Sequence, residues 1–210
     1  PSAEWGKIEE LNKEKEVVGI YLSAHPLDEF KFELENLCTH SLSELNDLTN
    51  YRNKEIVIGG MMSNVRHGMT KNNKPFGSFI IEDFSNQLKI TLFGKDYMDY
   101  KNYITMGYCV LIKGKVVQRN FQSDSNENER KISQIIMLHE VKEKMIKSIS
   151  LSVPINIIND TFISTFTNST KEGKVLLKFI IYDPVDNVRV EMFSRTQKIS
   201  INSTFINFLD

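Results

Sequence analysis

Residues 55–93 decide the fold, and they read EIVIGGMMSNVRHGMTKNNKPFGSFIIEDFSNQLKITLF. Apolar residues alternate with smaller or polar ones in 56–62, and two further apolar runs follow at 76–81 and 88–93. Alternation with a period of two is typical of strands that bury one face. Polar segments at 69–75 and 82–87 separate the runs. The stretch therefore predicts three consecutive strands.

The residues that follow continue the same domain. A helix is predicted over 94–106, where Tyr97, Tyr100 and Ile104 share one face. Two more strands are predicted over 109–117 and 131–141, on either side of a polar segment at 120–130. Five strands with a helix between the third and the fourth is the order of the OB-fold barrel. The sequence thus predicts a five-stranded OB-fold barrel within residues 51–147.

Two flanking segments complete the organisation, which is predicted to be mainly β with α (α+β). Residues 1–50 are predicted to be a helical leader, with one helix up to Leu22, a second from Pro26 and a capped turn from Ser41 to Glu44. Residues 148–210 are predicted to be a small C-terminal α/β domain. Its expected elements are strands at 149–153, 175–182 and 188–193, helices at 160–168 and 203–209, and a last short strand between 193 and 203.

Charge is unevenly distributed along the chain, although the net charge of the 210 residues is only −1. Residues 1–54 carry six Lys and Arg against eleven Asp and Glu, whereas residues 55–119 carry nine against five. The basic segment coincides with the predicted barrel. The net charge therefore excludes a strongly electrostatic nucleic-acid partner but not a weak one.

Localisation is inferred from what the sequence lacks. No run approaches 18 uncharged apolar residues, so a membrane-spanning helix is not expected and no membrane partner is predicted. The first residues, Pro1 to Trp5, lack the pattern of a secretion signal. Cys38 and Cys109 lie far apart and are expected to be reduced thiols. We expect a cytoplasmic protein.

No catalytic constellation is visible in the sequence. The four histidines are scattered, and Cys38-Thr39-His40 lacks a second ligand pair that would complete a zinc site. Glu82 and Asp83 are better suited to forming a turn than to sharing a metal. There is no glycine-rich phosphate loop and no nucleophile elbow. We therefore expect no catalytic residue, no metal, no cofactor and no enzymatic activity in this chain.

A nucleic-acid face is predicted on the barrel. OB folds bind single strands on the outer face of strands 2 and 3, flanked by the loops between strands 1–2 and 4–5. Because successive side chains of a strand alternate between its faces, the strand residues predicted to contact nucleic acid are Phe76, Ser78, Lys89, Thr91, Phe93, Lys113 and Lys115. The loop between strands 1 and 2 adds Lys71 and Lys74, with Arg66 at its entrance. Two aromatic rings and a few cations predict weak, salt-sensitive binding. The alternative is that Phe76 and Phe93 cover an interface with a neighbouring domain.

Two motifs resemble those of a known family. Residues 16–28, EVVGIYLSAHPLD, resemble the E-x-x-G-x-Y-L-S-x-H-P-L segment of bacterial replicative DNA polymerase III alpha subunits (polymerase family C). Residues 60–83 and 113–116 resemble the OB pattern of the same family, with Asn73 where that family commonly has glycine. The resemblance covers residues 14–141 and extends to the tail by element order.

The resemblance implies a C-terminal fragment of a replicative nucleotidyltransferase whose catalytic carboxylates lie upstream, so that the fragment itself is non-catalytic. It implies that the OB domain contacts single-stranded template DNA and that residues 148–210 dock the clamp-loader tau subunit. The full-length protein would also bind the sliding clamp. His25 would have a structural role between the catalytic body and the barrel.

Two other functions stay open on the residues alone. One is a protein-interaction scaffold without DNA binding, in which the barrel only spaces its neighbours. The other is an OB-fold anticodon-binding domain of a tRNA synthetase, which would prefer a folded tRNA.

Overall fold

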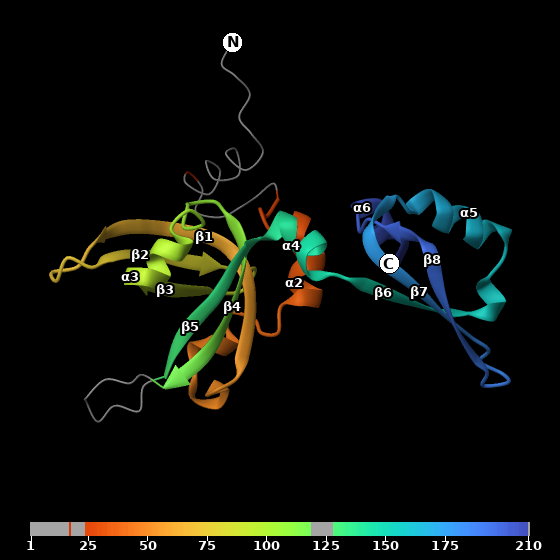
Figure 1. Ribbon diagram of the computed structural model, residues 1–210, viewed down its shortest axis with the longest axis horizontal. Coiled ribbons are helices and arrows are strands. Elements are labelled where there is room, and N and C mark those ends of the chain that lie inside the picture. The colour runs from red at the N-terminus through yellow and green to blue at the C-terminus, as the bar shows by residue number, and fades with distance from the viewer. Residues whose placement is uncertain (1–16, 18–23, 119–127, 210) are drawn as a thin grey trace, which may run out of the picture. The chain divides into compact units, whose positions relative to one another are not determined.

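The computed structural model describes Val17, residues 24–118 and residues 128–209. The chain divides into two compact units, residues 1–139 and 140–210, which we call unit 1 and unit 2 (Figure 1). Apart from Val17, the predicted leader helix up to Leu22 lies outside the described residues, as does most of the polar segment 120–130. None of the described helices is long and apolar enough to span a membrane.

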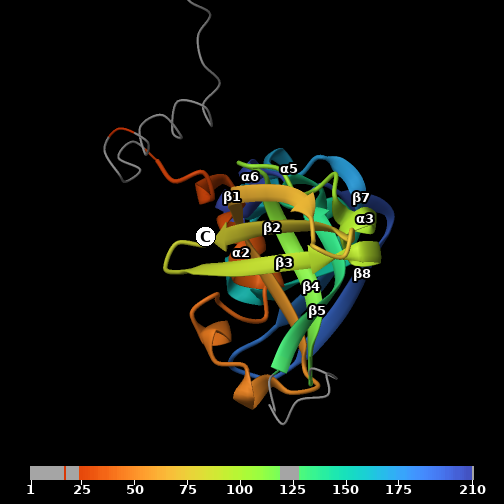
Figure 2. The ribbon, with the colours of Figure 1, turned by 90° about the vertical axis from the view of Figure 1, so that its left-hand side faces the viewer.

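Unit 1 is built on a five-stranded antiparallel sheet. Its strands are β1 (Glu55–Met69), β2 (Pro75–Glu82), β3 (Gln87–Phe93), β4 (Cys109–Gln118) and β5 (Asn128–Met137). They lie in the order β3-β2-β1-β4-β5 (Figure 2), which confirms the predicted five-stranded OB fold. No ladder joins the edge strands β3 and β5 within the described residues, so the predicted barrel is an open one.

Alternation along each strand builds the core of unit 1. Phe79 and Ile81 of β2 are fully buried, and the even-numbered apolar residues of β3 are also buried. Leu45, which precedes β1, and Ile104, which follows β3, pack into the same cluster. At Gly77 a Cβ atom would lie 2.7 Å from the Tyr97 ring, so the close packing of that ring on β2 requires glycine.

Two predicted elements of unit 1 end earlier than expected. The helix α3 (Gly94–Tyr100) stops at Tyr100 rather than at residue 106. The chain then turns so that Ile104 is buried against β2, with its N–H donated to the carbonyl of Lys101. The predicted strand 131–141 becomes α4 (Leu138–Met145) after Met137. Leu138 and Val141 are both fully buried at a spacing of three residues, which suits a helix.

Between residues 24 and 54, the described part of the segment before β1 carries one α-helix and three single turns of 3₁₀-helix. These elements are η1 (Asp28–Phe30), α2 (Lys31–Leu37), η2 (Glu44–Asn46) and η3 (Thr49–Tyr51). The helix predicted from Pro26 therefore begins two residues later, as η1. Half of the predicted capped turn is present, because the Ser41 N–H donates to Glu44 Oε2 at 2.8 Å. The helical turn itself begins only at Glu44, with Ser43 as its N-cap and no side-chain cap hydrogen bond. Leu34 of α2 packs on Gly59 of β1, where a Cβ atom would lie 2.4 Å from Leu34 Cδ2.

Unit 2 has a three-stranded sheet in the order β6-β7-β8. Its elements are β6 (Ser148–Pro154), η4 (Ile155–Ile157), α5 (Asp160–Ser169), β7 (Glu172–Tyr182), β8 (Arg189–Ile199) and α6 (Ser203–Leu209). β6 and β7 are parallel and connected through α5, whereas β7 and β8 are antiparallel. The predicted α/β tail is confirmed. The expected last short strand is not separate, because β8 runs through an irregular register to Ile199.

Phenylalanine rings hold the two helices of unit 2 on one face of its sheet. Phe166 of α5 contacts Phe179 of β7 at 5.2 Å between ring centroids, and Phe208 of α6 at 5.7 Å. Phe205 of α6 is fully buried. The opposite face carries the alternate side chains of β7 and β8, among them Leu176, Lys178 and Phe193.

Candidate nucleic-acid interface

A β-bulge in β1 sets which side chains reach the outer face of unit 1. Ser63 pairs with Ile80 of β2 and Arg66 with Ser78, so three steps along β1 match two along β2. Asn64 within the bulge has φ of +47°, in the left-handed region. The alternation of 56–62 would place Arg66 on the core side together with Met62, and the bulge turns it outward. The sequence prediction placed Arg66 at the entrance of the β1–β2 loop and did not include the bulge.

Three rows of side chains cross the outer face of β1, β2 and β3. Paired residues of neighbouring strands point to the same face of a sheet, and the registers give these rows directly. They are Gly68–Phe76–Phe93, Arg66–Ser78–Thr91 and Ser63–Ile80–Lys89. The structure therefore brings together six of the predicted residues on one surface, which we call the row surface.

The first row is aromatic. The rings of Phe76 and Phe93 lie 6.1 Å apart at an angle of 37°. Phe93 is 53% exposed. A Cβ atom on Gly68 would lie 2.9 Å from Cε1 of Phe76, so the absence of a side chain lets this ring lie against β1. Phe76 is half-buried, so the pair forms a partly exposed aromatic surface of the kind on which nucleobases stack.

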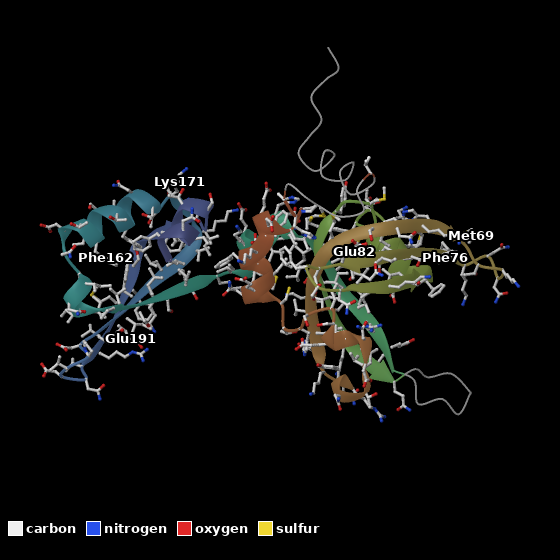
Figure 3. The ribbon with its side chains drawn as sticks, turned by 180° about the vertical axis from the view of Figure 1, so that it is seen from behind. Met69, Phe76, Glu82, Phe162, Lys171 and Glu191 are labelled. Carbon is white, nitrogen blue, oxygen red and sulfur yellow. The ribbon has the colours of Figure 1, made fainter. Side chains whose placement is uncertain are left out.

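Polar groups continue the surface beside the aromatic pair. The Thr91 hydroxyl donates to Ser78 Oγ at 3.1 Å, which leaves one rotatable hydroxyl proton for a ligand. Arg66 and Lys89 are exposed on either side of this pair. At the end farthest from the aromatic row, Glu82 accepts a hydrogen bond from Ser63 (Figure 3). The surface thus changes from aromatic to cationic to anionic along β2.

The β1–β2 loop brings two further predicted cations next to the aromatic row. Lys71 and Lys74 are exposed in a tight turn, in which the Thr70 N–H donates to the Lys74 carbonyl at 2.8 Å. Asn73 has φ of +54° in this turn. The loop therefore demands a left-handed residue where Asn73 stands, and asparagine is the side chain that adopts this conformation most readily after glycine.

Lys113 and Lys115 do not join the other predicted residues. They lie on β4, opposite Val57 and Glu55 in the first half of β1. Nine residue steps along β1 lead from Val57 to Arg66, which is at most about 30 Å along an extended chain. Lys115 also faces the carboxylate of Glu55 across the ladder. Strand alternation indicated correctly that these lysines are not in the core, but the pairing of β4 with the far half of β1 places them outside the row surface.

The turn between β2 and β3 is organised by Asp83, as the sequence predicted. Its carboxylate accepts hydrogen bonds from the backbone N–H groups of Leu42, Ser85 and Asn86, at 2.7 to 3.0 Å. Burial raises the pKa of Asp83, but these bonds and one from the Ser85 hydroxyl outweigh it and hold the pKa below its ordinary value. Asp83 therefore ties the turn to the segment before β1 in its ionised form.

Replacing Asp83 by asparagine is expected to destabilise unit 1 by about 1–2 kcal/mol at neutral pH. A carboxylate whose pKa is lower in the folded state contributes stability above its unfolded pKa of about 3.9, and this is lost as the pH falls. Urea denaturation followed by circular dichroism between pH 7 and pH 3 measures the free energy of unfolding of both proteins. The difference between Asp83→Asn and the wild type should become smaller toward pH 3. A difference that does not change with pH would contradict a stabilising role of the ionised Asp83 carboxylate.

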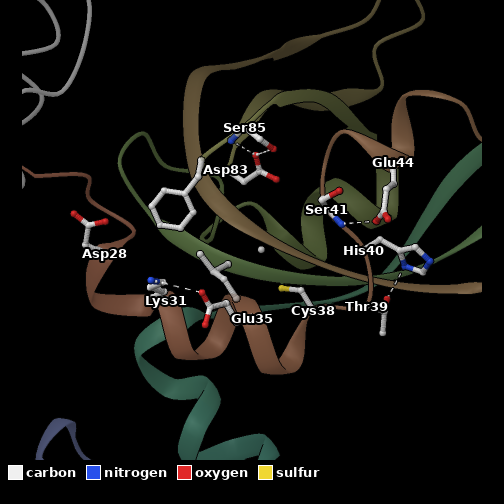
Figure 4. A pocket seen from close by; sticks show the side chains of 13 residues that line it. Asp28, Lys31, Glu35, Cys38, Thr39, His40, Ser41, Glu44, Asp83 and Ser85 are labelled. Carbon is white, nitrogen blue, oxygen red and sulfur yellow. Dashed lines mark hydrogen bonds and ion pairs between the residues drawn. The ribbon is translucent and has the colours of Figure 1, made fainter. Parts of the chain in front are cut away.

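A cleft of about 610 Å³ lies between α2, the segment 38–44 and the β2–β3 turn (Figure 4). Its charged lining is mostly anionic, with Asp28, Glu35, Glu44 and Asp83 against Lys31. Such a lining repels phosphate groups, so the cleft is not a candidate site for nucleic acid.

The cysteine and histidine side chains discussed next have structural rather than reactive roles. Burial and then the charge of Asp83 raise the pKa of Cys38 to about 12, and burial followed by Glu29 raises that of Cys109 to about 11, so neither is a reactive thiolate. His67 contacts the Tyr97 hydroxyl at 3.0 Å and the Ile104 carbonyl at 3.1 Å. The His25 ring accepts the Leu27 N–H at 3.2 Å. Among the described residues no group of three acidic, His or Cys side chains could hold a metal ion.

Comparison with known proteins extends this picture to both units. Residues 56–138 match a tRNA-anticodon family described as "OB-fold nucleic acid binding domain". Residues 149–210 match the family described as "DNA polymerase III alpha subunit, C-terminal domain". The resemblance to DNA polymerase III alpha subunits is confirmed.

Curated alpha subunits align with most of this chain. The chain is 27% identical over 160 residues to the alpha subunit of Pasteurella multocida, covering 76% of the chain and 13% of that protein. It is 28% identical over 171 residues to that of Borreliella burgdorferi, covering 81% and 14%. With the protein of Escherichia coli O157:H7 the identity is 22% over 208 residues, covering 98% and 18%. The chain therefore spans less than a fifth of the length of these relatives.

Solved structures with OB folds also resemble part of the chain. The SSB domain of a Synechococcus protein superposes with a TM-score of 0.30 at 11% identity, covering 40% of this chain and 92% of that domain. The yeast mitochondrial single-stranded DNA binding protein Rim1 gives a TM-score of 0.30 at 18% identity, with 41% and 96% covered.

Proposed function

We propose that this chain is a non-catalytic C-terminal segment of a DNA polymerase III alpha subunit, acting in the cytoplasm in chromosomal replication. Its row surface contacts single-stranded template DNA, and unit 2 docks the clamp-loader tau subunit. The row surface carries the proposal: an aromatic pair and two cations lie in register on adjacent strands of a chain similar to alpha subunits. Polymerisation and sliding-clamp binding belong to parts of the full-length protein outside this chain.

Single-stranded DNA suits the row surface better than a duplex does. Stacking on Phe76 and Phe93 requires unpaired bases, and each stacked base contributes about 1–3 kcal/mol. Arg66, Lys89 and the loop lysines provide charges for the phosphates on both sides of the aromatic pair. The anionic end of the surface at Glu82 limits the track, so binding is weak.

The 210-residue chain is expected to bind fluorescein-labelled oligo-dT, with an affinity that falls as salt rises from about 50 to 200 mM. If two to four phosphates are neutralised, the slope of log K against log salt is about −1.4 to −2.8. Anisotropy titration measures both quantities. Absence of binding at every salt concentration would favour the scaffold function, and tighter binding of a folded tRNA would favour an anticodon-binding domain.

Docking of tau is assigned to the sheet face of unit 2 that lies opposite its helices. Leu176 and Phe193 are 47% and 68% exposed there. Lys178 pairs with Phe193 across the ladder, with its Nζ 5.0 Å from the ring centroid, and forms an ion pair with Glu191. Exposed apolar side chains bordered by fixed charges are typical of protein-binding surfaces.

A further inference from the structure

Asn64 is an unusual residue at its place in β1. Four described residues other than glycine have positive φ, and all four are asparagines: Asn53, Asn64, Asn73 and Asn187. Three of them lie in turns or loops, whereas Asn64 lies inside a strand. Its side chain is exposed, so packing does not hold it there. A left-handed residue within a strand, beside a binding surface, points to a positioning role.

The consequence of this conformation is a change of phase along β1. Before the bulge, Ile58 and Met62 point into the core and are at most 1% exposed. After it, Val65 packs against the core, and Arg66 points outward in the row of Ser78 and Thr91. An uninterrupted strand would direct the Arg66 guanidinium toward the core, where an unpaired charge is strongly unfavourable.

The bulge also determines which residue of β1 lies against the aromatic pair. Gly68 is two residues beyond Arg66 and therefore faces outward with it. There it lies beneath the Phe76 ring. In an uninterrupted strand the outward position next to Phe76 would belong to a residue with a side chain, His67 or Met69. The conformation of one residue thus determines both contributions of β1 to the row surface, which are the Arg66 cation and the side-chain-free position of Gly68 beneath the Phe76 ring.

We propose that Asn64 is the positioning residue of the nucleic-acid face: its left-handed backbone sets the phase of β1 that presents Arg66 and Gly68 to the DNA. This inference rests on the proposed DNA binding. Asparagine satisfies two conditions at once, because it adopts positive φ more readily than other residues with a side chain and restricts the unfolded chain more than glycine does. β-Branched residues strongly disfavour this conformation.

The test compares Asn64→Val with Asn64→Gly in the 210-residue chain, using oligo-dT anisotropy at several salt concentrations. Asn64→Val is expected to weaken binding about five- to tenfold and to make the salt slope shallower by about 0.7, the equivalent of one lost phosphate contact. Asn64→Gly, which keeps the left-handed conformation, is expected to retain affinity and slope. In Arg66→Gln the slope should change equally, and adding Asn64→Val to it should leave the slope unchanged.

Asn53→Val is the matched control for general strain. Asn53 has φ of +62° and lies just before β1, away from the row surface. The variant Asn53→Val should lower the melting temperature as Asn64→Val does, but it should not change the salt dependence of DNA binding. Equal slope changes in both valine variants, or an unchanged slope in Asn64→Val, would overturn the inference. If the wild type binds no DNA, the proposed function itself fails. If Arg66→Gln changes the salt slope and Asn64→Val does not, only the role of Asn64 is rejected.

Discussion

Replacing Phe76 and Phe93 together by alanine is expected to weaken binding of oligo-dT by about thirty- to several-hundred-fold. The two rings form one aromatic surface, with centroids 6.1 Å apart, of which Phe93 is the more exposed member. Its removal eliminates the stacking of one or two bases, worth about 2–4 kcal/mol in total. Both side chains lie on the outer face of the sheet, so the core of unit 1 is not disturbed by the substitutions.

The matched control for this pair is Phe84→Ala. Phe84 is 52% exposed, close to the 53% of Phe93, but it lies in the β2–β3 turn and contacts the His25 ring instead of the row surface. Anisotropy at low salt should show wild-type affinity for this control. The salt slope of the double variant should stay close to that of the wild type, because no cation is removed. Loss of binding in Phe84→Ala, or none in the double variant, would contradict the stacking surface.

Introducing aspartate at both Leu176 and Phe193 is expected to reduce the affinity of the chain for purified tau subunit by about thirtyfold or more, as loss of a buried interface anchor does. Both side chains project from the uncovered sheet face of unit 2. Two carboxylates on that face would have to be desolvated against tau without a partner. Calorimetric titration of tau into the chain measures the change.

Val185→Asp provides the control for the tail experiment. Val185 is 87% exposed in the turn between β7 and β8, outside the sheet face. The same charge there should leave tau binding unchanged, and circular dichroism should show that all variants are folded. DNA binding should be unaffected by the tail substitutions. Equal losses in the control and the double variant would reject this face as the docking site, and undiminished binding in both would do so too.

Local sequence pattern was sufficient for the five strands of unit 1 and for the outward direction of Phe76, Phe93 and Lys89. These properties depend on alternation with a period of two, which burial of one sheet face imposes on the sequence. The role of Asp83 in the turn was also predictable because it depends on neighbours in the sequence. Its carboxylate accepts hydrogen bonds from backbone N–H groups two and three residues ahead.

Properties that depend on strand pairing were not predictable from local pattern. Lys113 and Lys115 alternate correctly along β4, yet only the pairing of β4 with Val57 and Glu55 shows that they lie far from Arg66. The bulge had a weak local signal, an asparagine within an apolar alternation. The change from β5 to α4 was hidden because Ile136 and Leu138 fit the period of a strand, and the helical spacing becomes clear only with Val141.

The two halves of β1 pair with different strands, and this arrangement has a mechanical consequence. Met61 pairs with Glu82 of β2 on one side and with Cys109 of β4 on the other, so β2 holds the second half of β1 and β4 holds the first. In the proposed DNA complex, tension from a template bound on β2 and β3 would reach β4 and β5 along the covalent backbone of β1. A force directed along the strands would load the two hydrogen-bonded ladders lengthwise, in shear, so that their bonds share the force instead of opening one after another.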